Sequence, residues 1–500
     1  MLRLHRERAR PYERAAHLFG LCLLACACAS PAPAPEPGTE RAQLSSYGDH
    51  VAWSKKPPGL EPVDVPQFVA VTFDDNFVSG LGDVSGGMTW ATTFLEPLKN
   101  PAASGFAPTW DGSPVRTTFF DNCVYLQDDP TKKSWKTARE AGHEIANHTV
   151  NHPNGGSFSA MQWTDEIAPC TAALSDPDSG VGVTVDEVRG FRAPYLAYDS
   201  ELFGVLTAQG LWYDTSIQSC WADGDDGKAC AWPYTLDQGS PDAVDLTTKF
   251  QTPSVSGASG LWEATPSVLF VPPDDLATQY GFEPGLRQRV PTDMPAPSFY
   301  EPATGRIAPL DITLFVDAGL SPTEVLATLK YTLDLRLAGN RAPFIFIAHT
   351  HVYASNYGAA PKAPDAGGRQ RAIEDFVQYA LTKPTVRMRP VTDLIEWMRH
   401  PQPLDGVVSA KPATGGAGGG AGSGGGGSAG RAGGGAAGNF SAGSGGVGGG
   451  TTSVVEASAA DTPGEERASC SCRVAKRAGD EAWLSVLVGL GLARRRRHAR

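Results

Sequence analysis

A glycine-rich run near the C-terminus limits how much of this 500-residue chain can form a compact core. Of the 57 glycines, 21 lie between positions 415 and 450, where Phe440 is the single aromatic residue. A segment that lacks large apolar side chains cannot bury enough surface to offset the entropy cost of ordering its backbone. Glycine does not recur at every third position, which excludes a collagen-like helix. We therefore expect a flexible spacer there, with an r.m.s. reach of roughly 30 to 35 Å.

The net charge of −12 conceals an uneven distribution of charge along the chain. The first 14 residues carry five arginines against two glutamates, and the last seven carry five more arginines, so the ends contribute +8 and the rest carries −20. Proteins that bind nucleic acid need clustered Lys and Arg along the phosphate backbone. We therefore exclude a nucleic-acid partner and expect a soluble protein that works outside the cytoplasm.

The N-terminus has the pattern of an export signal. Four arginines within the first ten residues precede a short apolar stretch at 18–25, and small residues follow it. These are the basic, apolar and cleavage regions of a secretory signal peptide, and the apolar part is too short to span a bilayer as a helix. The run Leu23-Leu24-Ala25-Cys26 resembles a bacterial lipobox. Two outcomes stay open: lipidation of Cys26, or ordinary cleavage a few residues later.

The C-terminus carries a second candidate targeting segment. Cys470 and Cys472 precede a short apolar run at 483–493, which ends in a cluster of arginines. The run is too short to span a bilayer unaided, but a basic cluster behind it is typical of a tail that a membrane retains. The arrangement resembles the myxobacterial sorting tail, which is processed at the cysteine, and it predicts display on the cell surface. The alternative is an amphipathic helix that docks on the folded domain.

Between these segments the sequence predicts one folded domain with an α/β fold. Short β-rich runs alternate with helix-like segments, as expected for strand–helix units around a parallel sheet. The region is large enough for a single core, and α/β barrels of this size form one domain. The expected division of the chain is a signal peptide at 1–29, a Pro-rich linker at 30–65, the folded domain at 66–401, a Gly-rich linker at 402–466 and the sorting tail at 467–500.

Two of the strand-like segments are followed by groups that can bind a metal or move a proton. An apolar run at 68–73 ends in Asp74 and Asp75, at the strand end where barrel enzymes place their chemistry. Such a pair also serves as a helix cap or turn former. Farther along, His148 and His152 are four residues apart, so both rings can reach one cation if that segment turns helically. Pairs with this spacing also occur by chance on protein surfaces.

Two further strand-like segments end in polar residues. Arg192 follows an apolar-aromatic strand and is either a buried ion-pair partner or a group that orients a catalytic carboxylate. Pro194 fixes the local backbone and can leave the N–H of Tyr195 facing a cavity. A fully apolar strand ends in His349 and His351, and alternation along a strand points both side chains the same way.

The order of these motifs resembles a known enzyme family. TFDD at 72–75, HTVNH at 148–152, RGFRAPY at 189–195 and the apolar strand ending in His349 together resemble the NodB-type polysaccharide deacetylases, carbohydrate esterase family four. That resemblance implies a distorted (β/α) barrel. Additional stretches resemble insect-type chitin deacetylases: GFRAPYL at 190–196, YDTSI at 213–217, WPYTLD at 232–237 and GNRAPF at 339–344.

The resemblance assigns roles to the metal-binding and basic residues. It implies that Asp75, His148 and His152 bind a divalent metal, with zinc expected and cobalt or another divalent ion as alternatives. Two histidines and one carboxylate leave coordination positions open, as a catalytic metal requires. The resemblance makes Asp74 the general base that takes a proton from the attacking water, and Arg192 the residue that holds Asp74 in place.

The resemblance also assigns the oxyanion and acid roles, with one departure. It implies that the Tyr195 backbone N–H stabilises the oxyanion and that His349 protonates the departing amine. Many members have D-x-x-D-W at the fourth motif, whereas here Asp214 is followed by Thr-Ser-Ile. Asp214 is therefore only a candidate to orient His349. His351 is an alternative acid, a substrate contact or a surface residue.

Four cysteines lie in the predicted domain, and their even number favours disulfides in an exported protein. Cys220 and Cys230 flank an Asp/Gly-rich loop and are the expected pair, which leaves Cys123 for Cys170. Three pairings are possible in principle, and a metal–thiolate site is the lesser alternative because the domain has no C-x-x-C spacing.

Taken together, these features predict a metal-dependent hydrolase that removes N-acetyl groups from an N-acetylglucosamine polymer, either chitin-like or peptidoglycan, and releases acetate. We expect an exported monomer that is either held in the cell envelope or at the cell surface through its termini or secreted. Two alternatives remain: an O-acetyl polysaccharide esterase, and a non-catalytic carbohydrate-binding protein that keeps the fold.

Overall fold

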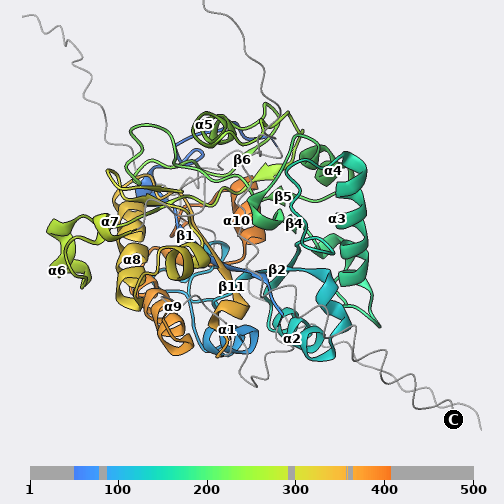
Figure 1. Cartoon of the computed structure of the whole chain (residues 1–500), viewed down its shortest axis with the longest axis horizontal. Coiled ribbons are helices and arrows are strands. Elements are labelled where there is room, and N and C mark those ends of the chain that lie inside the picture. Colours follow the sequence, from blue (N-terminus) through green and yellow to red (C-terminus); the bar gives the residue numbers. More distant parts are fainter. Residues whose placement is uncertain (1–49, 78–86, 291–298, 356, 358–363, 407–500) are drawn as a thin grey trace, which may run out of the picture. The chain divides into compact units, whose positions relative to one another are not determined.

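The computed structural model describes residues 50–77, 87–290, 299–355, 357 and 364–406 (Figure 1). All of them belong to one compact unit of the chain. The expected signal peptide with Cys26, the sorting tail with Cys470 and Cys472, and most of both linkers lie outside these residues.

A nine-stranded sheet forms the centre of the described fold. Its order is β11-β1-β2-β3-β4-β5-β7-β6, and β12 also pairs with β1. The pairs from β11 to β7 are parallel, whereas β6 runs antiparallel to β7. The strands are β1 (Gln67–Asp75), β2 (Thr118–Asp121), β3 (Glu144–Asn147), β4 (Gly190–Phe191), β5 (Tyr213–Asp214), β6 (Tyr234–Thr235), β7 (Trp262–Glu263), β11 (Phe344–His349) and β12 (Val386–Met388).

Helices connect the parallel strands, as the alternating sequence pattern predicted (Figure 1). No pair between β11 and β6 closes the ring among the described strands, so the barrel is distorted. The expected α/β class and distorted (β/α) barrel are confirmed. The connecting helices are α1 (Gly87–Leu95), α2 (Asp129–Glu140), α3 (Ala160–Ser175), α4 (Leu202–Ala208), α8 (Pro322–Ala338) and α9 (Ala366–Leu381), and α10 (Val391–Arg399) follows the last described strand.

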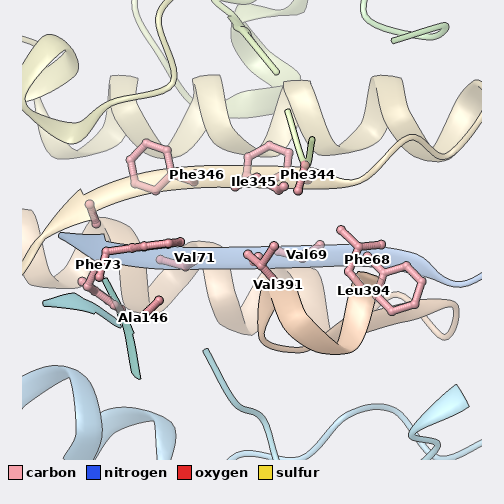
Figure 2. Packing of buried hydrophobic residues seen from close by; sticks show 14 of the residues in the cluster. Phe68, Val69, Val71, Phe73, Ala146, Phe344, Ile345, Phe346, Val391 and Leu394 are labelled. Carbon is pink, nitrogen blue, oxygen red and sulfur yellow. The ribbon is translucent and has the colours of Figure 1, made fainter. Parts of the chain in front are cut away.

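Strand β1 is the centre of the core, and all nine of its residues are buried. A strand buried on both faces carries a continuous apolar run rather than an alternating one, which explains its sequence. Figure 2 shows its apolar side chains beside those of β11 and α10. The ring of Phe68 lies 5.3 Å from that of Trp397 on α10. Burial of each such aromatic side chain stabilises the fold by about 1.5 to 3 kcal/mol, so this packing holds the start of β1 in the core.

A long insertion between β5 and β11 forms a smaller layer of its own. It contains α5 (Pro241–Phe250), α6 (Ala277–Tyr280) and α7 (Leu286–Arg289), together with an antiparallel sheet of order β8-β10-β9. These strands are β8 (Leu269–Phe270), β9 (Tyr300–Glu301) and β10 (Arg306–Ile307). The insertion reaches the main sheet again through a π-helical turn, η7 (Ile312–Asp317), which precedes α8.

Two disulfides join the four cysteines of the domain in the pairing expected from the sequence. One links Cys123, in the short helix η3 (Cys123–Gln127), to Cys170 in α3, with Cα atoms 5.4 Å apart. The other links Cys220 to Cys230 across the Asp/Gly-rich loop, with Cα atoms 5.1 Å apart. Because all four sulfurs are used in these bonds, they do not form the alternative metal–thiolate site.

Candidate functional site

The polar residues singled out in the sequence come together at the carboxyl ends of the parallel strands. Asp74 and Asp75 end β1, and His349 ends β11. The register of these two strands places Asp74 directly beside His349. His148 follows β3 and Arg192 follows β4, so both enter at the same edge of the sheet. Ligand sites in open parallel sheets form at this edge.

Asp75, His148 and His152 form a cluster that can hold one metal ion. One candidate ligand atom from each lies within 4.8 Å of the others. The Asp75 Oδ1 atom is 3.2 Å from His152 Nε2 and 3.8 Å from His148 Nε2. His148 Nδ1 lies 2.7 Å from the carbonyl oxygen of Arg192, which can only accept, so Nδ1 carries the proton. The Nε2 lone pair therefore stays available to a cation, an arrangement common to metal-binding histidines.

The charges in this cluster suit a divalent cation. Burial lowers the pKa of His148 to about 4, so its ring is neutral at neutral pH. Burial alone would raise the pKa of Asp75, but the surrounding histidines, led by His152, outweigh it and lower that pKa. A charged carboxylate and neutral imidazole are the protonation states that a metal requires.

The two histidines meet through a strained loop rather than the helical turn on which the sequence argument depended. Thr149 and His152 have φ angles of 68° and 54°. Of the ten described non-glycine residues with positive φ, six lie in the three loops of this site: Asp75, Asn76, Thr149, His152, Tyr195 and Leu196. Such conformations cost roughly 1 to 3 kcal/mol each and persist only where the surroundings enforce them.

Buried hydrogen bonds enforce these conformations. Asn76 donates from Nδ2 to the carbonyl oxygen of Phe73 at 2.8 Å and to Asp121 Oδ1 at 2.8 Å. The backbone N–H of Thr149 donates to the Asn147 side chain at 2.8 Å. Asn76, Asp121 and Asn147 are each fully buried. They were not singled out in the sequence, because each is a polar residue next to a motif rather than a part of its chemistry.

Asp74 is fixed by a buried arginine. Arg192 donates from Nη1 to Asp74 Oδ1 at 2.6 Å and to Thr72 Oγ1 at 2.8 Å. Its guanidinium lies 4.2 Å from the ring centre of Phe120, and its side chain is fully buried. A buried ion pair with this many partners fixes the carboxylate in one orientation.

The carboxylate that binds His349 is Asp311 rather than the candidate Asp214. His349 Nδ1 lies 2.7 Å from Asp311 Oδ1, and the His349 backbone N–H donates to Asp311 Oδ2 at 2.8 Å. The Asp214 carboxylate instead accepts hydrogen bonds from the backbone N–H and the hydroxyl of Ser216, both at 2.8 Å. It also lies against Glu263, whose carboxyl has a raised pKa because of burial and the nearby Asp214 charge.

The pairing with Asp311 changes the acidity of His349. Burial alone would lower its pKa, but the charge and hydrogen bond of Asp311 outweigh burial and raise the pKa to about 9. The ring therefore carries two N–H protons at neutral pH. One proton faces Asp311, which leaves the one on Nε2 free to be donated.

The sequence of this region matches a family model. Residues 64–213 match the model described as Polysaccharide deacetylase, and this range contains the Asp74–Asp75, His148–His152 and Arg192 motifs. The chain contains a polysaccharide deacetylase domain.

Two curated proteins from Bombyx mori are similar to the chain that carries this polysaccharide deacetylase domain. Chitin deacetylase 1 is 25% identical over 185 residues, which cover 36% of this chain and 30% of that protein. Chitin deacetylase 8 is 23% identical over 359 residues, which cover 70% of this chain and 74% of that protein. The match therefore spans less than a third of the first relative and about three quarters of the second.

Solved structures are also similar to the polysaccharide deacetylase domain. A structure from Mycobacterium smegmatis assigned to the polysaccharide deacetylases has 16% identity and a TM-score of 0.39, covering 67% of this chain and 91% of that one. A family 4 carbohydrate esterase from Streptomyces lividans in complex with acetate has 18% identity and a TM-score of 0.21, covering 48% of this chain and 96% of that one.

The other predicted residues of the polysaccharide deacetylase domain also lie at the site. Tyr195, in the short helix η5 (Pro194–Leu196), has a φ of 60°, and its ring lies 4.6 Å from that of His152. His351 lies in the short helix η8 (Thr350–Tyr353), and its Nδ1 is 3.8 Å from Asp75 Oδ2. Asp311 was missed because it belongs to no motif. The available signal was a single carboxylate between Leu310 and Ile312 in an apolar stretch.

Proposed function

We propose that this domain removes N-acetyl groups from an N-acetylglucosamine-containing polysaccharide, chitin-like or peptidoglycan, in a metal-dependent hydrolysis that releases acetate. One observation carries the proposal. A carboxylate fixed by Arg192 and a protonated histidine fixed by Asp311 end two adjacent strands in register, next to a two-histidine, one-carboxylate cluster. Amide hydrolysis requires a general base, a general acid and a group that polarises the carbonyl, which here would be a metal ion in the cluster.

The residues proposed to hold the metal are Asp75, His148 and His152. The charged Asp75 carboxylate, the neutral His148 ring and the free Nε2 atom of His148 fit a zinc ion, and other divalent ions are alternatives. A bound divalent cation supplies Lewis acidity, which polarises the acetyl carbonyl and makes water easier to deprotonate. The cluster contributes only three protein ligands, so positions remain for water and substrate.

Asp74 is the proposed general base. It would accept a proton from the water that attacks the acetyl carbonyl carbon. Arg192 keeps Asp74 Oδ1 engaged at 2.6 Å, so the other carboxylate oxygen is the one that takes the proton. We propose that the backbone N–H of Tyr195 donates to the oxyanion that forms when water adds.

His349 is the proposed general acid. The C–N bond of the acetamide breaks as the sugar nitrogen takes the Nε2 proton, which yields acetate and a free amine. An amine anion is too basic to leave without this proton, and the raised pKa of His349 keeps it available at neutral pH. An alkoxide needs less assistance, so the pairing of His349 with Asp311 favours an amide substrate over an O-acetyl ester.

We propose that the protein acts outside the cytoplasm, through export by the 1–29 segment and retention by the 467–500 tail. Within the described part of the chain, no helix combines the length and apolar character needed to cross a bilayer. The acidic charge of the chain suits a neutral glycan rather than a polyanion.

The test is acetate release by the full chain from N-acetylglucosamine oligomers, peptidoglycan and O-acetylated xylan, each with and without a chelator. We expect acetate from an N-acetylated substrate, loss of activity with the chelator and recovery after zinc is added back. Absence of chelator-sensitive acetate from all three substrates would refute the proposal. Release from xylan alone would replace it with the esterase alternative.

A further inference from the structure

His351 occupies the side of the Asp75 carboxylate that the candidate metal cluster does not use. His148 and His152 both face Oδ1 of Asp75, at 3.8 and 3.2 Å. Nδ1 of His351 faces the other oxygen, Oδ2, at 3.8 Å. This Nδ1 atom is buried and has no hydrogen-bond partner among the described residues. A buried polar atom without a partner is uncommon and calls for an explanation.

The His351 ring is held in this orientation by packing. It stacks on Phe77 with ring centres 4.9 Å apart and an angle of 14° between the planes, and the ring of Tyr357 lies 5.4 Å away. The backbone of η8 is fixed as well, because Gly87 of α1 lies so close to the Thr350 carbonyl that a Cβ on Gly87 would come within 1.5 Å of that oxygen. Packing therefore holds Nδ1 of His351 facing the Asp75 carboxylate.

His351 is not equivalent to its neighbour His349. Nδ1 of His349 is already bound to Asp311 at 2.7 Å, whereas Nδ1 of His351 faces the carboxylate of Asp75 at 3.8 Å. The two rings meet at an angle of 64°, with centres 5.6 Å apart. His349 is thus bound to Asp311, whereas His351 faces Asp75, a candidate metal ligand.

A carboxylate that binds a cation through one oxygen can rotate and bring in its second oxygen. Metal sites prevent this with a hydrogen bond to the second oxygen, and loss of such a bond typically weakens metal binding by about 10- to 100-fold. A rotation that brings Oδ2 closer to Nδ1 of His351 by about 1 Å would form that bond.

We propose that His351 is a positioning residue, which donates from Nδ1 to Asp75 Oδ2 and holds Asp75 in a one-oxygen binding mode. The inference rests on the proposed metal site, and it assigns His351 neither to the metal shell nor to proton transfer.

Two matched substitutions test the inference in the full chain. His351→Phe keeps a ring that can stack on Phe77 but removes the donor. His351→Asn shortens the side chain but places an amide N–H near the position of Nδ1. Zinc affinity is measured by competition with a chelator, and the folded state is checked by thermal unfolding. We expect the Phe variant to bind zinc about 10- to 100-fold more weakly and the Asn variant to recover most of that loss.

X-ray absorption of the zinc-loaded protein provides a readout that does not depend on activity. We expect two imidazole ligands in the wild type and in both variants. Wild-type affinity in a folded Phe variant would overturn the inference and leave the proposed function intact. Three imidazoles in the wild type would also overturn it, because His351 would then be a ligand. A wild-type chain that binds no zinc would overturn the inference and the proposed metal dependence together.

Discussion

The pairing of His349 with Asp311 predicts how activity depends on pH. The raised pKa of His349, about 9, depends on the charge and hydrogen bond of Asp311, because burial alone acts in the opposite direction. A general acid works in its protonated form, so activity should be present below this pKa and fall as the pH rises through about 9.

Asp311→Asn removes the charge while keeping the size of the side chain. The pKa of His349 should then fall from about 9 to about 6.5 or lower, which corresponds to a loss of roughly 3 kcal/mol of stabilisation of the protonated ring. At pH 8 the protonated fraction would fall from about 0.9 to about 0.03, so kcat/KM should fall about 30-fold. At pH 6 the loss should be smaller than at pH 8.

The assay is acetate release from N-acetylglucosamine oligomers across pH 5.5 to 10.5, with thermal unfolding as a check on folding. Asp214→Asn is the matched control, since Asp214 is a buried aspartate at the end of β5 whose carboxylate accepts hydrogen bonds from Ser216 rather than from His349. We expect the alkaline fall of activity in the control to stay near pH 9. An alkaline fall that stays near pH 9 in Asp311→Asn, or that shifts equally in Asp214→Asn, would contradict the assigned pairing.

Three further outcomes are expected. Asp74→Asn should retain zinc, measured by metal analysis, but lose turnover by a factor of about 10² to 10⁴. Asp75→Ala should lose the zinc as well. Turnover near the wild-type rate in Asp74→Asn would show that the base is misassigned. The raised pKa values of the buried Asp214 and Glu263 carboxyls mean that their contribution to stability is fully present below the ordinary carboxyl pKa of about 4 and is lost as the pH rises through the raised values, about 6 for Asp214. Glu263→Gln should therefore flatten the fall of the unfolding temperature above about pH 4; an unchanged slope would argue against this pair. Loss of the Cys123–Cys170 disulfide, with its sequence separation of 47, should lower the free energy of unfolding by about 4 kcal/mol in denaturant titrations, against about 3 kcal/mol for Cys220–Cys230, with its separation of 10; the reverse order would contradict the chain-entropy account.

The sequence was sufficient to predict the parts of the site that lie at strand ends. Asp74, Asp75 and His349 each end a strongly apolar strand, and parallel strands bring their carboxyl ends to one edge, so the motifs predicted their proximity. The pairing of Arg192 with Asp74 came from the family resemblance, since the residues alone left Arg192 as either an ion-pair partner or an orienting group.

Asp311 could not be predicted in the same way. It lies 38 residues before His349, in an insertion whose path no local pattern specifies, and the two meet only through tertiary contacts. The conformation of the loop that joins His148 to His152 was not predicted for a different reason. Spacing of four residues suggested a helical turn, but Thr149 and His152 adopt positive φ angles that buried hydrogen bonds enforce. Local propensity cannot predict a strained conformation that distant residues stabilise.

The register of β1 and β11 makes the separation of the proposed base and acid a property of the backbone. Asp74 and His349 are neighbours on a hydrogen-bonded ladder at the carboxyl ends of β1 and β11, so backbone hydrogen bonds rather than a loop conformation set their separation. The distance between the proposed base and the proposed acid should therefore stay constant when residues of the insertion other than Asp311 change.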